Sequence, residues 1–239
     1  MTQTAPTAGA KDRAPEVQAM FDQLAPSYDR ANRVLSLGLD QRWRRKAISQ
    51  LGDAGRGRVL DLCAGTLDLS QQLIEDGAES VVSIDFAAEM LAAGRAKLPH
   101  DAPIEVICAD ARELPLEDNS VDAIICGFGL RNVPELPRAI AECARVLRPG
   151  GVLVVLDFFR PKSWLSRVLQ STYNRFIMPF IGGLLTGYGE AYRYLASSID
   201  AFQSRSEFES LLAEHGLQPG SRDMFPPVAS MVWGVQPCD

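Results

Sequence analysis

The feature that most constrains this chain is the alternation, through its middle, of short apolar runs and amphipathic segments. The apolar runs are rich in β-branched residues, as buried strands are, and several are separated by segments with helical spacing. This alternation predicts an α/β fold in which a mainly parallel sheet carries helices on both faces. We expect strands at 58–63, 80–85, 104–110, 121–128 and 151–159, and helices at 67–76, 87–98 and 134–147.

The segments on either side of this alternation have a different character. Residues 16–51 show helical spacing broken by Pro and Gly, which predicts an N-terminal helical cap, and the polar residues 1–15 are expected to be a disordered tail. The basic, aromatic-rich residues 160–199 are expected to form a helical insertion into a single domain that spans 16–239. A helix at 204–216 and two short strands at 217–224 and 228–235 should close the chain.

Composition narrows the class of protein. The 239 residues, 46% hydrophobic and 23% charged, suit one globular domain. The net charge of −6 argues against nucleic acid as a partner, because domains that bind it are usually basic. Five cysteines without C-x-x-C spacing argue against a zinc site or a disulfide framework, and no metal-ligand cluster is visible. The N-terminus lacks the apolar core of a signal peptide. We therefore expect a cytoplasmic protein.

The turn after the first predicted strand, DLCAGTLDLS at 61–70, is the first candidate ligand site. In open parallel sheets, ligands bind outside the carboxyl ends of the strands. Asp85 ends the second strand, 20 residues after Gly65 in the sequence, where a carboxylate can accept both hydroxyls of an adenosine ribose. The third strand ends at Asp110 and Ala111, where a carboxylate can accept a hydrogen bond from the adenine amino group.

The residues around this turn favour one nucleotide over others. A dinucleotide site requires G-x-G-x-x-G, and that pattern is absent, with Leu67 in place of a glycine. Asp61 and Asp68 flank the turn; their carboxylates would repel a diphosphate but suit the ammonium and sulfonium groups of S-adenosylmethionine (SAM). The alternative is an ordinary strand–turn–helix in which Asp68 interacts with the helix dipole.

Longer motifs carry a resemblance to a known family. The order DLCAGT, SIDFAAEML, CADARELPLEDNSVD, RVLRPGG resembles the class I SAM-dependent methyltransferases. More narrowly, the chain resembles the ubiquinone/menaquinone biosynthesis C-methyltransferases of the UbiE type from about residue 20 to 216. The blocks that carry this likeness are MFDQLAPSYDRANRVLSLGLDQRWRR (20–45), GFGLRNV (127–133), RVLRPGGVLVVLDFFRP (145–161) and GEAYRYLASSI (189–199).

The resemblance implies a fold, a cofactor and a reaction. The fold is the Rossmann-like class I methyltransferase fold, with an antiparallel C-terminal strand on a mainly parallel sheet. The cofactor is SAM, and the reaction is methylation of a ring carbon of a prenylated quinol, such as demethylmenaquinol, or the related step on a ubiquinone precursor. The family's cofactor positions fall on Thr66, Asp85, Asp110, Ala111 and, where the family often has serine, Gly127.

The sequence departs from the family pattern in two places. The turn reads G-T-L-D where the family usually has G-T-G-D, and the C-terminal strand lacks the family's glycine pair and aliphatic–His ending. If position 67 requires a positive φ, a leucine there costs on the order of 1 kcal/mol or more. If it requires only a helical φ, the leucine side chain lies near the methionine tail of the cofactor.

The implied chemistry assigns roles to Arg131 and Asn132, which follow the fourth predicted strand. A quinol carbon becomes nucleophilic when the adjacent hydroxyl loses its proton. Arg131 stays charged, so it can lower the pKa of that hydroxyl, hold the phenolate, or orient a water that takes the proton. Asn132 can hydrogen-bond the ring oxygen. The alternative for Arg131 is an ion pair with a carboxylate such as Asp157 that only fixes a loop.

Further contacts are expected outside these motifs. Asp61 and Tyr28 are candidates near the methyl donor, and Tyr192 and Tyr194 are candidates for the quinol pocket, although tyrosines at helical spacing are more often core residues. Residues 160–190 combine basic side chains with the short apolar run FIMPFIGGLL, which suits a peripheral membrane contact. A lid helix or a homodimer contact is the alternative for that segment.

Two other functions remain open from the sequence. One is a SAM-dependent methyltransferase of the same fold that acts on another small aromatic or natural-product substrate. The other is a catalytically silent relative that binds a quinone or a partner protein, and Leu67 is the main support for it. The chain lacks the glycine fingerprint G-x-G-x-x-G of NAD-dependent reductases, which argues against that function.

Overall fold

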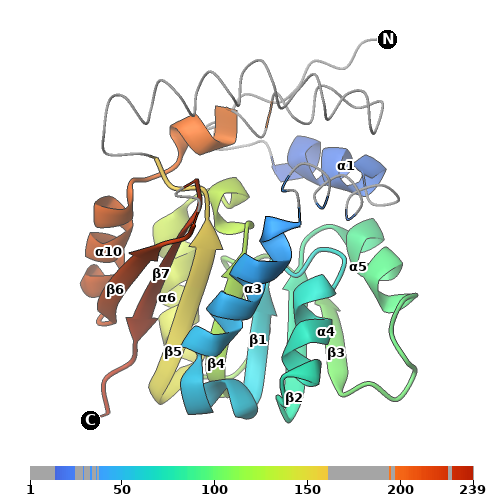
Figure 1. Ribbon diagram of the computed structural model, residues 1–239, viewed down its shortest axis with the longest axis horizontal. Coiled ribbons are helices and arrows are strands. Elements are labelled where there is room, and N and C mark those ends of the chain that lie inside the picture. The colour runs from blue at the N-terminus through green and yellow to red at the C-terminus, as the bar shows by residue number, and fades with distance from the viewer. Residues whose placement is uncertain are drawn as a thin grey trace.

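A seven-stranded sheet forms the centre of the computed structural model, which describes residues 14–24, 29, 33, 36, 38–160, 194, 197–225 and 228–238. The strand order is β3-β2-β1-β4-β5-β7-β6, and neighbours from β3 to β5 are parallel (Figure 1). The strands are β1 (Arg58–Leu62), β2 (Ser80–Asp85), β3 (Ile104–Cys108), β4 (Val121–Gly127), β5 (Leu147–Asp157), β6 (Gln218–Asp223) and β7 (Ser230–Val235). The predicted α/β class is confirmed.

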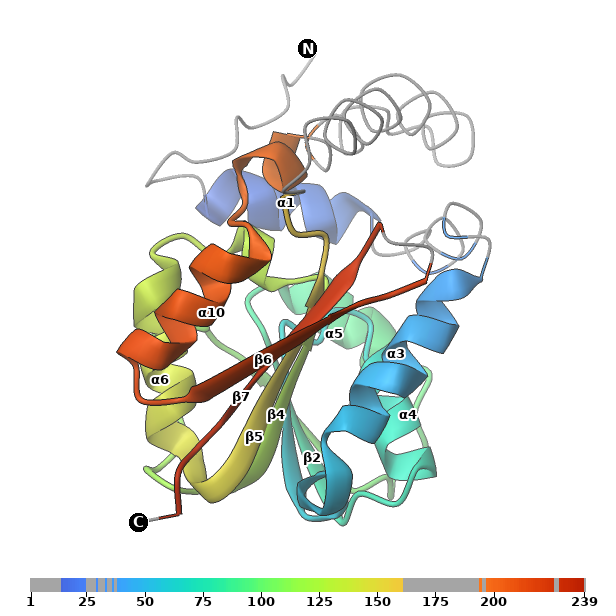
Figure 2. The same ribbon diagram turned by 60° about the vertical axis from the view of Figure 1, so that its left-hand side comes forward.

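Helices cover both faces of this sheet. Figure 2 shows α3 and α4 on one side of it and α6 and α10 on the other. Apolar side chains alternate between the faces because successive residues of a strand point in opposite directions: Val59 packs with the α3 side, Leu60 and Leu62 with the α6 side. The helices are α1 (Ala14–Leu24), α3 (Leu39–Gln50), α4 (Asp68–Glu75), α5 (Ala88–Arg95), α6 (Leu136–Val146) and α10 (Arg205–Glu214), with short 3-10 turns η1 (Gly52–Arg56) and η2 (Leu130–Asn132).

The predicted antiparallel closure at the C-terminus is present. β7 runs antiparallel to both β5 and β6, so β6 runs in the direction of the parallel strands. Several ends differ from the prediction by one to three residues, and a larger difference is at β5, which begins at Leu147 rather than at 151. Its pairing with β4 shifts register between Val121 and Ala123, and Gly150 adopts a φ of 78°, so the Pro149–Gly151 stretch that looks like a helix terminator lies inside the strand.

The segments outside the sheet are described only in part. α1 begins at Ala14, inside the stretch expected to be a tail, and packs against α5 over the end of the sheet (Figure 1). The side-chain amide of Gln18 donates to the carbonyl of Phe86 at 2.8 Å. Most of the predicted insertion at 160–199 lies outside the described residues, which omit 161–193, 195 and 196. The predicted membrane contact at 160–190 lies in that stretch, apart from Arg160. None of the described helices combines the length and the apolar character needed to cross a bilayer.

Candidate active site

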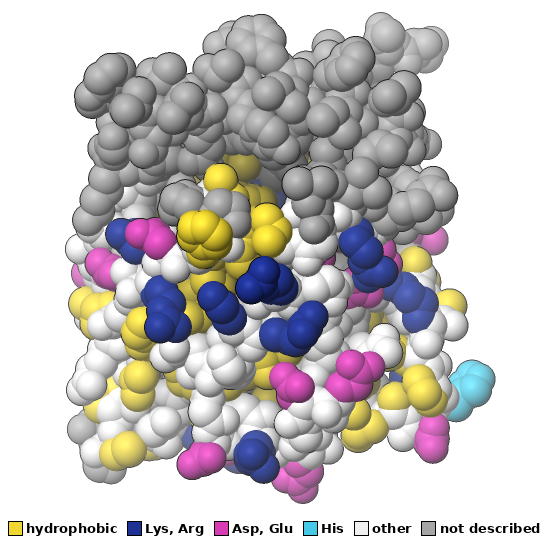
Figure 3. Space-filling model, in the orientation of Figure 1, with side chains coloured by type: hydrophobic (Ala, Val, Ile, Leu, Met, Phe, Trp, Pro, Cys, Tyr) yellow, Lys and Arg dark blue, Asp and Glu magenta, His cyan; other side chains and the backbone are white. Residues whose placement is uncertain are grey.

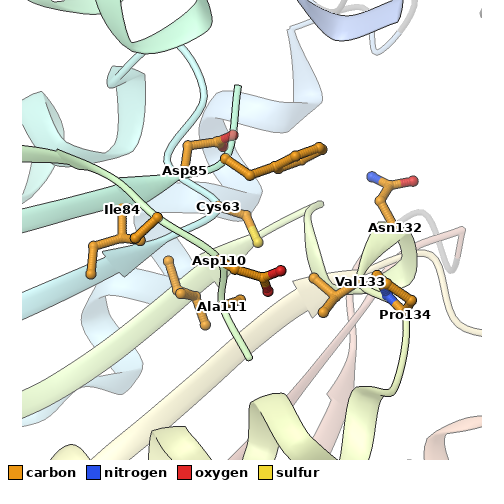
Figure 4. A pocket seen from close by; sticks show the side chains of 11 residues that line it. Cys63, Ile84, Asp85, Asp110, Ala111, Asn132, Val133 and Pro134 are labelled. Atoms are coloured by element: carbon orange, nitrogen blue, oxygen red, sulfur yellow. The ribbon is translucent and has the colours of Figure 1, made fainter. Parts of the chain in front are cut away.

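Two adjoining cavities lie at the carboxyl ends of β1, β2 and β4. The strand order reverses between β1 and β4, which is where open α/β sheets bind ligands. Each cavity has an empty volume of about 400 Å³, which includes space open to solvent. Asp85 and Asn132 line both cavities. Figure 4 shows Cys63 between Asp85 and Asp110, with Asn132 across the cavity.

The turn after β1 has an unusual backbone. Cys63, Gly65 and Leu67 all have positive φ angles, of 56°, 54° and 62°. Only glycine adopts this region without cost. The turn therefore stores strain at the cavity edge, as functional sites often do.

Leu67 adopts the first of the two conformations considered from the sequence, a left-handed one. Its side chain does not lie in either cavity. It is 1% exposed and packs with Ala64 and Leu91. Gly94 of α5 makes room for it, since a Cβ at position 94 would lie 2.5 Å from the Leu67 Cγ. Burying a leucine contributes about 2 kcal/mol, which offsets the left-handed backbone.

Asp85 joins the turn to the end of β2. One carboxylate oxygen accepts the backbone N–H of Gly65 at 2.8 Å, and the other accepts that of Ala87 at 2.8 Å. Burial raises the pKa of this carboxyl, opposed by its bonds from the backbone N–H groups of Ala87 and Gly65. Each oxygen has a further lone pair, so the carboxylate can still accept ligand hydroxyls, as predicted for a ribose.

Asp110 and Ala111 line the first cavity, as the sequence predicts for an adenine site. The Asp110 side chain points across the cavity towards Val133 and Pro134 (Figure 4). Arg112 holds the Asp110 carboxylate through its side chain, at distances from 2.6 to 3.1 Å. Hydrogen bonding from Arg112 lowers the pKa of Asp110, so this carboxylate stays an acceptor. The sequence did not predict this partner.

Arg131 and Asn132 lie on η2 at the same edge of the sheet. The Arg131 guanidinium donates to the Asp157 carboxylate at 2.8 Å and to the carbonyl of Phe128. The ion pair that the sequence left as an alternative is therefore present, and it is buried: the two side chains are 6% and 0% exposed. The Asn132 carbonyl oxygen is buried and has no hydrogen-bond partner among the described residues, so a ligand donor could satisfy it.

Thr66 is not among the residues that line the two cavities. It is buried, and its hydroxyl donates to the carboxylate of Asp29. Lys97 bridges Asp29 at 2.6 Å and Asp68 at 3.2 Å. The turn is thus tied to α4, to the residues after α5 and to the N-terminal segment. Sequence reasoning missed Asp29. The signal that could have pointed to it is that this carboxylate lies within the N-terminal block 20–45, which carries the resemblance.

Asp61 lies buried beneath the turn rather than among the residues that line the two cavities. Its carboxylate accepts the Ser70 hydroxyl, which also contacts the Ser83 hydroxyl at 2.8 Å. The second Asp61 oxygen has no partner among the described residues. Burial raises the pKa of Asp61 to about 7, against the opposing effects of the Ser70 hydroxyl and the Arg44 charge.

This pKa leads to a prediction for pH dependence. An Asp61 pKa near 7 in the folded protein, against 3.8 ordinarily, means that the folded state binds the proton more tightly. The proton on Asp61 therefore stabilises the folded protein by about 4 kcal/mol. This contribution is complete below pH 3.8 and is lost as the pH rises through 7, so the free energy of unfolding slopes downwards with pH over this range. Asp61→Asn mimics the protonated form, so it should remove this slope from urea unfolding measured between pH 5 and 8. Asp53→Asn, at an exposed position, is the control; equal slopes in Asp61→Asn and the parent would contradict the prediction.

The remaining predicted positions contribute less to the two cavities. Gly127 ends β4, and a Cβ there would meet Leu69 at 3.4 Å and Arg44 at 3.9 Å; it is not among the residues that line them. Tyr28 and Tyr192 lie outside the described residues, whereas Tyr194 is buried and is not among the residues that line the two cavities.

Several lining residues were not predicted from the sequence. Gly129 approaches the turn so closely that a Cβ would lie 2.2 Å from the Cys63 Cβ. Phe21 of α1 and Phe86 line the second cavity. Cys63 looked like a strand residue, and Phe21, although it lies in the block 20–45 that carries the resemblance, had no feature that marked it as a contact with the site.

Comparison with known proteins agrees with this geometry. The model of the ubiE/COQ5 methyltransferase family matches residues 7–228. A ubiquinone/menaquinone biosynthesis C-methyltransferase UbiE of Syntrophotalea carbinolica is 41% identical over 212 residues, covering 87% of this chain and 89% of the relative. A demethylmenaquinone methyltransferase of Thermus thermophilus is 42% identical over 200 residues, covering 82% and 90%.

Solved structures share the fold at low sequence identity. A putative methyltransferase of Haloferax volcanii, solved in complex with the activator Trm112, superposes with a TM-score of 0.68 at 18% identity, covering 91% of this chain and 97% of that one. A SAM-dependent methyltransferase of Thermotoga maritima gives 0.65 at 18% identity, covering 92% and 99%. With its family match and its site at the strand-order reversal, the chain belongs to the ubiE/COQ5 methyltransferase family.

Proposed function

We propose that this methyltransferase transfers a methyl group from SAM to a ring carbon of a prenylated quinol, as in the conversion of a demethylmenaquinol to a menaquinol. The curated relatives named for this reaction match more than four-fifths of the chain. The observation that carries the proposal is the pair formed by Asp85 and Asn132: two buried acceptors line the same cavities beside a strained turn.

The residues of the site fit SAM. Asp85 would accept the ribose hydroxyls and Asp110 the adenine amino group, since both carboxylates line the cavity. The backbone of Gly65 borders the second cavity. When bound, SAM supplies an electrophilic methyl group on its sulfonium.

Arg131 and Asn132 would act on the quinol. The role that we propose for Arg131 is to stabilise the phenolate that forms when the quinol hydroxyl gives its proton to water, with Asp157 fixing the orientation of the guanidinium. Electrostatic groups fixed in advance stabilise developing charge without reorganising. The buried oxygen of Asn132 can accept a hydrogen bond from a hydroxyl of the ring and so position it.

Calorimetric titration with S-adenosylhomocysteine tests the cofactor site. We expect a micromolar Kd, about −8 kcal/mol, and a loss of affinity of about 10- to 100-fold in Asp85→Asn, because hydrogen bonds to a charged acceptor contribute about 1.5–3 kcal/mol. Thermal unfolding of the variant is measured alongside, since Asp85 also accepts bonds from Gly65 and Ala87. Unchanged affinity in a folded variant would place the ribose elsewhere.

Methyl transfer to a panel of substrates tests the reaction. The proposal predicts C-methylation of a short-chain demethylmenaquinol and much lower rates with simple phenols. Methylation of phenols alone would favour a methyltransferase of other aromatic compounds. Binding of a quinone without any transfer would favour a silent relative.

A further inference from the structure

The tip between β6 and β7 exposes large apolar side chains although it is well anchored. Phe225 is 82% exposed and Val228 44% exposed. The indole N–H of Trp43 donates to the Phe225 carbonyl at 3.1 Å, and the Met224 N–H donates to the Ala229 carbonyl at 3.0 Å. The backbone is therefore held on α3 while the Phe225 ring projects outwards. Pro226 and Pro227 stand between the two exposed residues in the sequence.

A stripe of basic side chains lies beside this tip on α3. Arg42, Arg45 and Lys46 are exposed, and their i, i+3, i+4 spacing places them on one face of the helix. Trp43 and Ala47 occupy the opposite, buried face. Across the described part of the chain, none of the three basic residues has an ion-pair partner. The stripe is thus an uncompensated positive surface on a chain whose net charge is −6.

Figure 3 shows the arrangement of the two features on one face. Lys and Arg side chains gather over α3, hydrophobic side chains lie directly above them, and acidic side chains lie to the sides of this group and farther down the same face. The tip follows β6, which runs parallel to β1, so it stands at the same carboxyl end of the sheet as the two cavities. Apolar side chains beside a row of cations suit the interface of an anionic bilayer. Aromatic rings such as that of Phe225 can enter the boundary of the acyl chains, while the basic side chains contact the anionic headgroups.

We propose that Phe225, Val228 and the basic stripe of α3 form a docking surface for an anionic phospholipid bilayer. This inference rests on the proposed function in one respect: a prenylated quinol resides in the bilayer, and docking would bring the open edge of the site to it. The surface is distinct from residues 160–190, for which the sequence suggested a membrane contact.

Vesicle sedimentation of the full-length protein tests this surface. The protein is mixed with vesicles of phosphatidylcholine alone or of phosphatidylcholine with phosphatidylglycerol, at low and high salt. We expect binding to the anionic vesicles that weakens as salt rises. The triple variant Arg42→Gln/Arg45→Gln/Lys46→Gln should bind about 100-fold more weakly, and Phe225→Ser about tenfold more weakly. The matched control Arg56→Gln/Arg138→Gln/Arg148→Gln removes the same charge from exposed positions elsewhere and should bind like the parent.

Four outcomes would overturn the inference. The parent protein could bind neutral and anionic vesicles equally, or it could bind neither. The surface variants could bind vesicles as tightly as the parent protein does. The parent protein could also form a dimer that Phe225→Ser separates in analytical ultracentrifugation, which would mean that a second copy covers the tip. Methyl transfer to a water-soluble short-chain quinol should be equal in the parent and all variants. If the parent transfers methyl but does not bind vesicles, this inference alone fails; if it binds vesicles but methylates no quinol, the proposed function fails.

Discussion

Arg131→Ala is expected to lower the free energy of unfolding by about 3–5 kcal/mol, because it leaves the Asp157 carboxylate buried without its cation. The Asp157 side chain is fully buried, and its guanidinium partner lies 2.8 Å away. Taking a charge out of water without a partner is among the most costly changes in a protein interior. The backbone N–H of Phe158, at 2.9 Å, cannot replace a full positive charge. Urea unfolding of the variant and the parent measures the difference.

A double variant separates the structural role of Arg131 from the proposed catalytic one. Arg131→Ala/Asp157→Asn removes both charges, and the new amide can still accept the backbone bond from Phe158. We expect it to recover most of the stability that Arg131→Ala loses. Its methyl-transfer rate should stay about 10²- to 10³-fold below that of the parent, as when a donor to a developing oxyanion is removed. A double variant with restored stability and a full rate would mean that Arg131 only fixes the loop. Parental stability in Arg131→Ala would mean that the ion pair contributes little to folding.

Gly94→Ala is the second change with a large expected effect, a loss of about 3 kcal/mol of stability together with weaker binding of S-adenosylhomocysteine. The added Cβ would lie 2.5 Å from the Leu67 Cγ and 2.7 Å from the backbone carbonyl of Thr66. Contacts this short with backbone atoms cannot be relieved by rotating a side chain, so the turn itself must shift. Thermal unfolding and calorimetric titration measure the two effects.

Two matched variants sharpen this test. Gly127→Ala also adds a methyl group near the turn, but its Cβ would meet Leu69 at an ordinary 3.4 Å, so it should cost less than about 1 kcal/mol. Adding Leu67→Gly to Gly94→Ala removes the shortest contact and leaves those with Thr66, so it should rescue the variant only in part. Parental stability and affinity in Gly94→Ala would show that α5 can move away from the turn.

The order of the elements could be predicted from the sequence because it depends on local patterns. Apolar β-branched runs form buried strands wherever they lie in the sheet, and the predicted span 80–85 coincides with β2. Asp85 could be predicted as a site residue for a related reason: parallel strands bring their carboxyl ends to one edge. The start of β5 was misplaced because Pro149–Gly151 resembles a helix terminator, and its pairing with β4 across a register shift is not local.

Single functional side chains were harder to predict because each depends on partners distant in the sequence. The hydroxyl of Thr66 is taken by Asp29, and the carboxylate of Asp61 lies beneath the turn with Ser70. Nothing in the sequence between residues 61 and 70 shows which way either side chain turns.

The sequence by itself determined the α/β class, the family and the position of the ligand edge, because hydrophobic periodicity, family motifs and the order of elements along the chain follow from residues near one another in the chain. Only the tertiary structure decided how Leu67 is tolerated and what Arg131 contacts. Leu67 requires the space left by Gly94 on α5, and Arg131 requires the carboxylate of Asp157 at the end of β5. Both depend on packing between elements that meet only in the folded chain, where desolvation and close contact set the energy of each group.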